Sequence, residues 1–249
     1  MTLQWNAAGV SDTGLRRAQN EDTLVLDEAR GLVIVADGMG GRPGGEYASA
    51  LAAQVVQGFL CSPEGSAGEP SDRMAKAVSL ANLEVWNASA TEPGRAGMGT
   101  TVTAISLNRD TRRWTIGHVG DSRGYLFRGG ELRRITRDHT VVQDLVESGA
   151  ISPSATADHP LGHLINRAVG TEGAVEVDTF GGDALPGDIF LLCSDGLAGL
   201  VTDSELEAAL QGLTSAGLDE KSAELVALAH ERGAPDNVTL GFLVISETV

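Results

Sequence analysis

The chain has 249 residues, of which 42% are hydrophobic and only 4% aromatic, so aliphatic side chains must fill the core of one large domain or two small ones. Its 34 acidic and 18 basic residues give a net charge of -16, which argues against nucleic acid or an acidic membrane as a partner. The 32 glycines and 8 prolines indicate many tight connections, and they argue against a helical bundle or a coiled coil.

The two cysteines, Cys61 and Cys193, stand far apart and outside any CxxC or Cys/His pattern. This argues against a zinc site and against a disulfide-linked secreted domain, and it favours reduced thiols in a cytosol. The N-terminus has no signal-peptide pattern, and apolar runs such as LVIVA and IFLLC are too short to span a bilayer. We therefore expect a cytoplasmic protein without membrane insertion.

The first half of the chain alternates β-rich and helical patterns. Two helices are predicted at 44–60 and 71–90, joined by a surface loop at 62–71. Short strands are predicted around them, at 23–27, 31–36, 100–107, 113–119, 124–128 and 131–136. Gly129-Gly130 between the last two strands is typical of a hairpin turn.

The second half continues with a helix at 141–147 and an irregular stretch to about 167. The elements predicted after it are strands at 175–180 and 189–193, helices at 203–210 and 220–232, and a last strand at 238–245. Hairpins connect the strands more often than crossover helices do. The sequence therefore predicts an α+β architecture of antiparallel sheets with helices packed outside them, rather than a doubly wound parallel sheet.

Aspartates recur at the ends of predicted strands. Asp37, Asp121 and Asp195 each follow an apolar strand and precede a small residue, and Asp236 stands just before the last strand. One such aspartate is an ordinary turn former. Because adjacent strands bring their ends to one sheet edge, the recurrence predicts converging carboxylates, whose repulsion a divalent cation would offset.

Near the N-terminus, Arg17 precedes Asn20, Glu21 and Asp22 at the start of a predicted strand. One interpretation is an exposed ion-pair cluster, which contributes little to stability. The other is an arginine close to metal ligands, where its planar fork of donors suits two oxygens of a phosphate.

Together these residues resemble the metal-dependent PPM/PP2C-type protein serine/threonine phosphatases, in their compact bacterial form. The resemblance runs in order through nearly the whole chain, in the motifs SDTGLRRAQNED, VIVADGMGGRPGGE, GTTVTA, HVGDSR, DHT, LLCSDGL and APDNVT. It implies a single domain over residues 1–249, with two antiparallel β-sheets forming a central sandwich flanked by helical layers (α-β-β-α). It also implies a flap near the active site at about 148–167.

The resemblance further implies a metal centre. Asp37 matches the aspartate that bridges two Mn²⁺ or Mg²⁺ ions, and the carbonyl of Gly38 matches a ligand of one of them. Asp195 and Asp236 match the carboxylates that complete the other ion. Asp121 resembles the ligand of a third, weaker metal in bacterial members.

The remaining implied roles concern the substrate. Glu21 and Asp22 match acidic residues that hold metal-bound water, and Arg17 matches the arginine that grips the substrate phosphate. The implied reaction is hydrolysis of phosphoserine and phosphothreonine in proteins by a metal-bridged hydroxide, without a phosphoenzyme. Met39 occupies the place where many eukaryotic members carry a histidine proposed to protonate the leaving group, so a metal-bound water is the hypothesis for that role. The expected partners are phosphorylated proteins and an opposing Ser/Thr protein kinase, and the chain is expected to be a monomer.

A serine hydrolase is the main competing enzyme. Residues 120–124 (GDSRG) satisfy the G-x-S-x-G pattern, and Asp195 and His230 follow in the order that α/β-hydrolases use. That pattern requires a helix directly after Ser122, where the sequence predicts a hairpin.

Two more hypotheses are a nucleotide-binding loop and a non-catalytic module. The loop GMGGRPGG lies between a strand and a helix, but Pro43 and Glu46 occupy positions where the two nucleotide-binding fingerprints need glycine and lysine. A phosphatase-like module that only binds partners would have lost metal carboxylates, and all of the expected ones are present.

The histidines form no metal-binding pattern. His118 and His230 are expected to be packing or surface residues. His139, His159 and His163 lie near or within the expected flap, and we expect them to be solvated loop residues more than substrate contacts.

Overall fold

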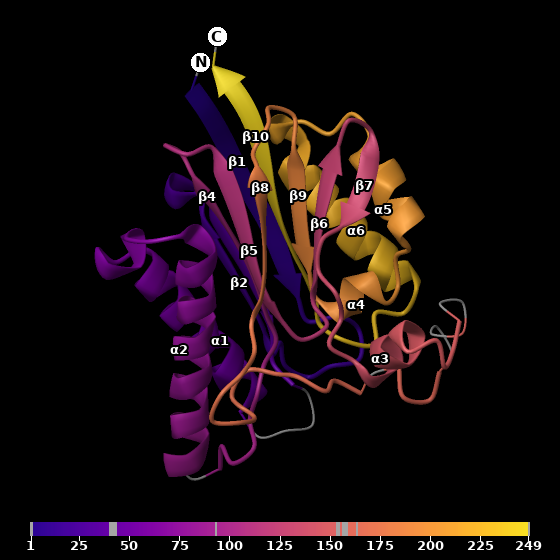
Figure 1. Cartoon of the computed structure of the whole chain (residues 1–249). Coiled ribbons are helices and arrows are strands. Elements are labelled where there is room, and N and C mark those ends of the chain that lie inside the picture. The colour runs from indigo at the N-terminus through magenta and orange to yellow at the C-terminus, as the bar shows by residue number, and fades with distance from the viewer. Residues whose placement is uncertain are drawn as a thin grey trace.

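The structure is a computed structural model that describes residues 2–39, 44–92, 94–152, 155, 159–162 and 164–248. Two five-stranded antiparallel sheets form its centre, with helices on the outer face of each (Figure 1). The predicted α-β-β-α sandwich is therefore confirmed. In the described part of the chain, no helix is both long and apolar enough to cross a bilayer.

The first sheet pairs the two ends of the chain. Its strands, in spatial order, are β1 (Thr2–Asp12), β10 (Val238–Thr248), β9 (Ile189–Cys193), β6 (Arg123–Arg128) and β7 (Glu131–Arg134). β1 and β10 pair over their whole length, from Thr2 opposite Thr248 to Asp12 opposite Val238. Strand β1 is absent from the sequence prediction, because its apolar residues are interrupted by asparagine, alanine and glycine and its pairing partner lies at the other end of the chain.

The second sheet is made of consecutive strands followed by one late addition. In spatial order these are β2 (Asp22–Asp27), β3 (Leu32–Asp37), β4 (Val102–Asn108), β5 (Arg113–Val119) and β8 (Asp178–Asp183). β3 is buried almost throughout and reads as an uninterrupted apolar run, as expected for a central strand with both faces covered.

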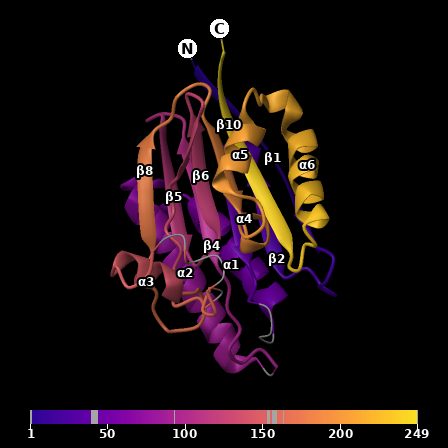
Figure 2. The ribbon, with the colours of Figure 1, turned by 90° about the vertical axis from the view of Figure 1, so that its right-hand side faces the viewer.

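Helices cover the outer faces of both sheets. α1 (Gly45–Leu60) and α2 (Pro70–Thr91) pack on the second sheet, and α4 (Asp195–Ala198), α5 (Asp203–Leu210) and α6 (Leu218–Glu231) cover the first sheet (Figure 2). α3 (Val141–Glu147) lies at the lower end of the sandwich. Three 3₁₀ turns complete the described elements, at Glu28–Arg30, Glu64–Ser66 and Ser215–Gly217.

Local sequence signals account for several element boundaries. The Thr202 side chain accepts from the backbone N–H of Glu205, and the Glu205 carboxylate accepts from Thr202, so a capping box begins α5. Gly129 and Gly130 join β6 to β7 with φ values of 63° and 91°, which confirms the predicted hairpin.

Candidate metal centre

The strand-end aspartates gather at one end of the sandwich. Asp37 is the last residue of β3, Asp121 follows β5, and Asp195 is the first residue of α4, just after β9. Asp236 stands two residues before β10. The prediction that adjacent strands bring these carboxylates to one sheet edge holds only in part. Strands β9 and β10 are adjacent and place Asp195 and Asp236 at one edge, whereas Asp37 and Asp121 follow β3 and β5 of the other sheet, which are separated by β4. It is the stacking of two sheets that brings the four residues together.

Asp22 joins this group through strand pairing. It is the first residue of β2 and lies directly opposite Asp37 in the antiparallel register. Ser194 and Thr239 donate hydrogen bonds to its carboxylate, from the ends of β9 and β10. The two sheets are therefore connected through polar contacts at this acidic end.

Three of these carboxylates, those of Asp22, Asp37 and Asp121, are shielded from solvent, and their acidity is reduced. Burial, followed by the charges of Asp22, Asp195 and Asp121, raises the pKa of Asp37 well above its ordinary value. Burial is also the main cause that raises the pKa of Asp22 to about 6 and that of Asp121 to about 8. A compensating positive charge at this place would favour the ionised form of each group.

Two carboxylate oxygens are available to bind a cation. Oδ2 of Asp22 and Oδ1 of Asp121 are buried, and neither has a hydrogen-bond partner among the described residues. A buried oxygen of this kind is unfavourable unless a proton, a water or a cation satisfies it. Oxygen donors from carboxylates are the ligands that Mn²⁺ and Mg²⁺ prefer, so the residues present fit divalent cations.

The carboxylates nevertheless do not surround a common point. Among the described residues, no three histidine, cysteine, aspartate or glutamate side chains are close enough to form a ready-made metal-binding group. The charges of Asp22, Asp195 and Asp121 each oppose ionisation of Asp37, as neighbouring like charges do. Rotation of the side chains toward a shared cation would bring their oxygens together.

The GTT motif fixes the backbone of Asp37. The Asp37 carbonyl accepts from Thr101 N–H at 2.8 Å and from the Thr100 hydroxyl at 2.8 Å. The Asp37 N–H donates to the Thr101 hydroxyl at 2.9 Å. Both main-chain groups of Asp37 are thus satisfied by buried threonines, which leaves its carboxylate to project from a rigid strand end.

Close backbone packing explains the glycine after Asp37. A Cβ on Gly38 would lie 2.3 Å from the carbonyl oxygen of Gly45 and 2.4 Å from that of Glu21, so no other residue fits without backbone movement. The Gly38 N–H donates to the Glu21 carbonyl at 3.1 Å. The glycine-rich loop therefore begins by packing against Glu21, and its residues 40–43, including Pro43, lie outside the described residues.

Asn237, which the sequence analysis missed, ties the N-terminal loop to the C-terminal strand. Its buried side chain accepts from the Glu21 N–H at 2.9 Å and donates to the carbonyls of Thr13 and Gln19 at 2.8 and 3.0 Å. Its position directly after Asp236 was the available signal, since a polar side chain between a turn and an apolar strand often bonds to the backbone.

Arg17 and Asp236 form the exposed rim of the centre. Nη2 of Arg17 donates to Oδ2 of Asp236 at 2.6 Å, and the two side chains are 37% and 36% exposed. Burial, which outweighs the opposing charge of Arg17, raises the pKa of Glu21 in the same loop. The structure therefore brings the predicted N-terminal residues beside the predicted metal ligands, with Arg17 paired to one of them.

The serine hydrolase interpretation is wrong. Ser122 is completely buried, and its hydroxyl is 2.7 Å from that of Thr101. Strand β6, not a helix, begins at the next residue. His230 forms a contact of 2.7 Å with Asp12 at the surface, so it takes no part in a triad with Ser122.

Two histidines pack in the interior behind the centre. Burial lowers the pKa of His118 to about 3, and its ring lies 4.8 Å from that of His139. His139 is only 1% exposed, which corrects the expectation of a solvated loop residue. Its Nδ1 accepts from the Gly120 N–H at 3.0 Å, and its Nε2 lies 3.2 Å from Asp178. It therefore supports the turn that carries Asp121.

The expected flap is only partly within the described residues. Residues 148–152, 155, 159–162 and 164–167 are described, whereas 153–154, 156–158 and His163 are outside the described residues. Thr140 and Ile165 form an isolated bridge that closes the segment at its base. In the described part, the Nδ1 atom of His159 accepts from the Leu161 N–H within the same loop.

Comparisons with known proteins agree with this architecture. The family described as protein phosphatase 2C matches residues 16–229. A serine/threonine protein phosphatase, PstP, of Mycobacterium tuberculosis is 41% identical over 240 residues, which are 96% of this chain, and the chain spans only 45% of the length of that relative. A serine/threonine phosphatase of Listeria monocytogenes is 36% identical over 92% of both chains.

A solved structure shows the same fold with metal bound. It is the catalytic domain of PstP in complex with two manganese ions, it is 38% identical to this chain, and its TM-score is 0.86 over 99% of this chain and all of that one. The family match and the identities settle the classification that the motifs predicted. The chain belongs to the protein phosphatase 2C family of serine/threonine protein phosphatases.

Proposed function

We propose that the chain hydrolyses phosphoserine and phosphothreonine in proteins with two bound divalent cations, Mn²⁺ or Mg²⁺. The observation that carries the proposal is the gathering of acidic side chains at one end of the sandwich, where Oδ2 of Asp22 and Oδ1 of Asp121 are buried without a hydrogen-bond partner among the described residues. The two manganese ions in the related catalytic domain support the same conclusion.

Asp37, Asp195, Asp236 and the Gly38 carbonyl would hold the two cations, and Asp121 would hold a third. When bound, such cations supply a water of lowered pKa and neutralise the charge of the phosphoryl oxygens.

Residues of the N-terminal loop would prepare the substrate. Arg17 is exposed at the rim and carries a planar fork of donors, so it is suited to orient two oxygens of the incoming phosphate. The carboxylates of Glu21 and Asp22 would accept hydrogen bonds from water beside the reacting phosphorus. Asn237 keeps this loop in place through its three backbone contacts.

The reaction needs no covalent phosphoenzyme. Ser122 is buried and hydrogen-bonded, so its hydroxyl is not available to attack phosphorus. The Met39 side chain carries no ionisable proton, and we assign protonation of the leaving serine or threonine oxygen to a water molecule.

A cavity of about 360 Å³ adjoins the centre on the side of α3. Asp121 and Asp195 line it together with Arg123 and Arg134, and both arginines form ion pairs with Asp138. Such a mixed polar lining suits a peptide backbone better than an apolar side chain, so we expect modest sequence specificity. The flap at about 148–167 would cover the substrate here.

The physiological partners of this proposal are phosphoproteins and the Ser/Thr protein kinase that modifies them. Cys61 and Cys193 are both free thiols, which fits a reducing compartment such as the cytoplasm. The large negative charge of the chain disfavours acidic substrates at low ionic strength.

The experiment that tests the proposal measures phosphate release from a phosphothreonine peptide in excess Mn²⁺ and in EDTA. We expect hydrolysis that EDTA abolishes and that added Mn²⁺ restores. Asp37→Asn should remove turnover, whereas Asp110→Asn, which changes an exposed aspartate in the turn between β4 and β5, should retain it. Hydrolysis that is indifferent to EDTA, or an active Asp37→Asn variant, would contradict the metal assignment.

A further inference from the structure

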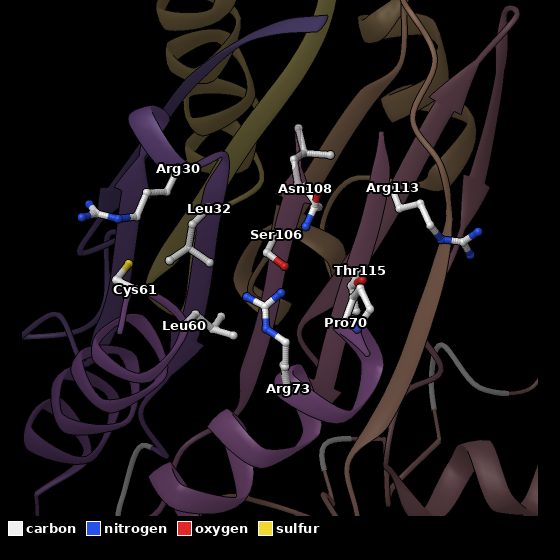
Figure 3. A pocket seen from close by; sticks show the side chains of 11 residues that line it. Arg30, Leu32, Leu60, Cys61, Pro70, Arg73, Ser106, Asn108, Arg113 and Thr115 are labelled. Carbon is white, nitrogen blue, oxygen red and sulfur yellow. The ribbon is translucent and has the colours of Figure 1, made fainter. Parts of the chain in front are cut away.

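A second polar cavity lies at the opposite end of β3 from Asp37. Its volume is about 70 Å³, and Leu32, the first residue of β3, forms part of its wall. Five strand steps of about 3.3 Å separate Leu32 from Asp37, or about 17 Å. The cavity is bounded by the end of α1, the start of α2 and strands β4 and β5 (Figure 3).

The sheet face below this cavity changes from apolar to polar. Val102 and Ala104 of β4 are buried under the helices, whereas Ser106, next on the same face, lines the cavity. Thr115 of β5 lies directly opposite Ser106 in the register. Thr115 is only 4% exposed, and its hydroxyl makes no hydrogen bond to any described residue. Two hydroxyl groups therefore face the same small space.

Arg73 of α2 supplies a positive charge to this space. Its Nε donates to the Gly65 carbonyl, which anchors the side chain, and its guanidinium points toward Ser106 (Figure 3). Among the described residues, Arg73 has no acidic partner. Most arginines of this acidic chain have one, including Arg30 and Arg113, which also line the cavity but are paired with Asp27 and Asp183 and point outward.

The rest of the cavity lining is also compatible with an anion. Within the described ranges, no aspartate or glutamate lines this cavity, although the chain has 34 acidic residues. The 22-residue helix α2 begins at Pro70 on the cavity wall, and its positive dipole end lies there, partly offset by the carboxylates of Glu69 at the N-cap and Asp72 in the first turn, neither of which lines the cavity. A guanidinium, two hydroxyls and a helix N-terminus are all groups that favour a small anion.

We propose that this cavity binds a tetrahedral oxyanion of the phosphate class, with the Arg73 guanidinium on two oxygens and the hydroxyls of Ser106 and Thr115 on the others. Its volume of about 70 Å³ is several times the roughly 10–15 Å³ that one water molecule needs, so the cavity has room for a group larger than a single water. The site is separate from the metal centre, and it stands whether or not the proposed hydrolysis is correct.

Titration of the ¹⁵N-labelled protein with inorganic phosphate tests the proposal. EDTA is present throughout, so that no metal ion is available to bind the phosphate. We expect saturable amide shifts at Ser106, Thr115 and residues 71–73, repeated with sulfate but not with chloride at equal ionic strength. A phosphothreonine peptide forms a second arm. Shifts with the peptide would mean that the site takes a protein-bound phosphoryl group, and shifts with phosphate alone would mean a free ion; both outcomes support the oxyanion site.

Three variants separate this site from the general surface charge. Arg73→Gln should weaken phosphate binding at least tenfold, and Thr115→Val about threefold. Lys76→Gln removes one charge from the next turn of the same helix, where Lys76 is paired with exposed Glu64 outside the cavity, and should bind phosphate as the original protein does. Circular dichroism of each variant establishes folding. No localised shifts in the original protein, or equal weakening in Arg73→Gln and Lys76→Gln, would overturn the proposal.

Discussion

Replacement of Asn237 by alanine should damage both the stability and the activity of the protein. The Asn237 side chain is 4% exposed and makes three hydrogen bonds to the backbone of the N-terminal loop. Each such bond contributes about 1 kcal/mol net, and a buried group left without a partner costs about 1–3 kcal/mol. Because water can reach the carbonyls of Thr13 and Gln19 once the amide is removed, we expect a total loss of about 3 kcal/mol.

The activity of this variant should fall by more than its stability explains. The loop that Asn237 holds carries Arg17 and Glu21, and a displacement of about 1 Å in such groups can lower turnover about 100-fold. Urea denaturation gives the free energy of unfolding, and phosphate release from a phosphothreonine peptide at saturating Mn²⁺ gives kcat and KM. We expect a rise in KM as well as a fall in kcat, because Arg17 is the proposed phosphate contact.

Two further variants make the test specific. Asn237→Asp keeps an acceptor for the Glu21 N–H but turns a carboxylate toward two carbonyls and beside Asp236, so it should be at least as unstable as the alanine variant. Asn87→Ala changes an exposed asparagine on α2 and should leave stability within about 0.5 kcal/mol. If Asn237→Ala unfolded like the original protein with unchanged kinetics, the amide would not be holding the loop.

Other expected outcomes concern the serine and the acidic residues. Ser122→Ala should lose about 1 kcal/mol of stability through its bond to Thr101 but keep activity within a few-fold, and a loss of all activity would return Ser122 to the mechanism. In EDTA, the free energy of unfolding should fall as the pH rises from about 4 to about 8. In the folded protein the pKa values of Asp22 and Asp121 are raised to about 6 and about 8. Over this pH range the folded protein therefore holds protons that the unfolded chain releases. A flat profile by urea denaturation would show that these groups titrate normally. Asp37→Asn should make this decline shallower and should stabilise the metal-free fold at pH 8. A variant less stable than the original protein would mean that the neighbouring carboxylates do not repel the charge of Asp37.

Sequence patterns located most elements because each pattern was local. The strand at Arg113–Val119 and the helices at Val141–Glu147 and Asp203–Leu210 have the predicted bounds, since apolar periodicity and flanking turn residues agree there. Strand β1 could not be found in this way. Its stability comes from pairing with β10, more than 200 residues later, and no local pattern carries that information.

The candidate site was likewise predictable only where its signal is local in the sequence. The recurrence of aspartates at strand ends is visible in the sequence, and the structure gathers those side chains at one end of the fold. The environment of each residue is not visible. The burial of His139 and the three contacts of Asn237 depend on segments that are distant in the chain, as does the ion pair between Arg17 and Asp236.

At the acidic centre, the stability of the fold is linked to metal binding. Burial of several carboxylates that raise one another's pKa values is unfavourable for the metal-free fold at neutral pH, and the GTT motif and Asn237 hold the backbone against that repulsion. A cation that enters would remove the repulsion and satisfy the buried oxygens of Asp22 and Asp121 at once. Metal binding therefore relieves a repulsion that is already present in the folded chain. Because this repulsion is greater when the carboxylates are ionised, divalent cations should raise the free energy of unfolding by more at pH 8 than at pH 5.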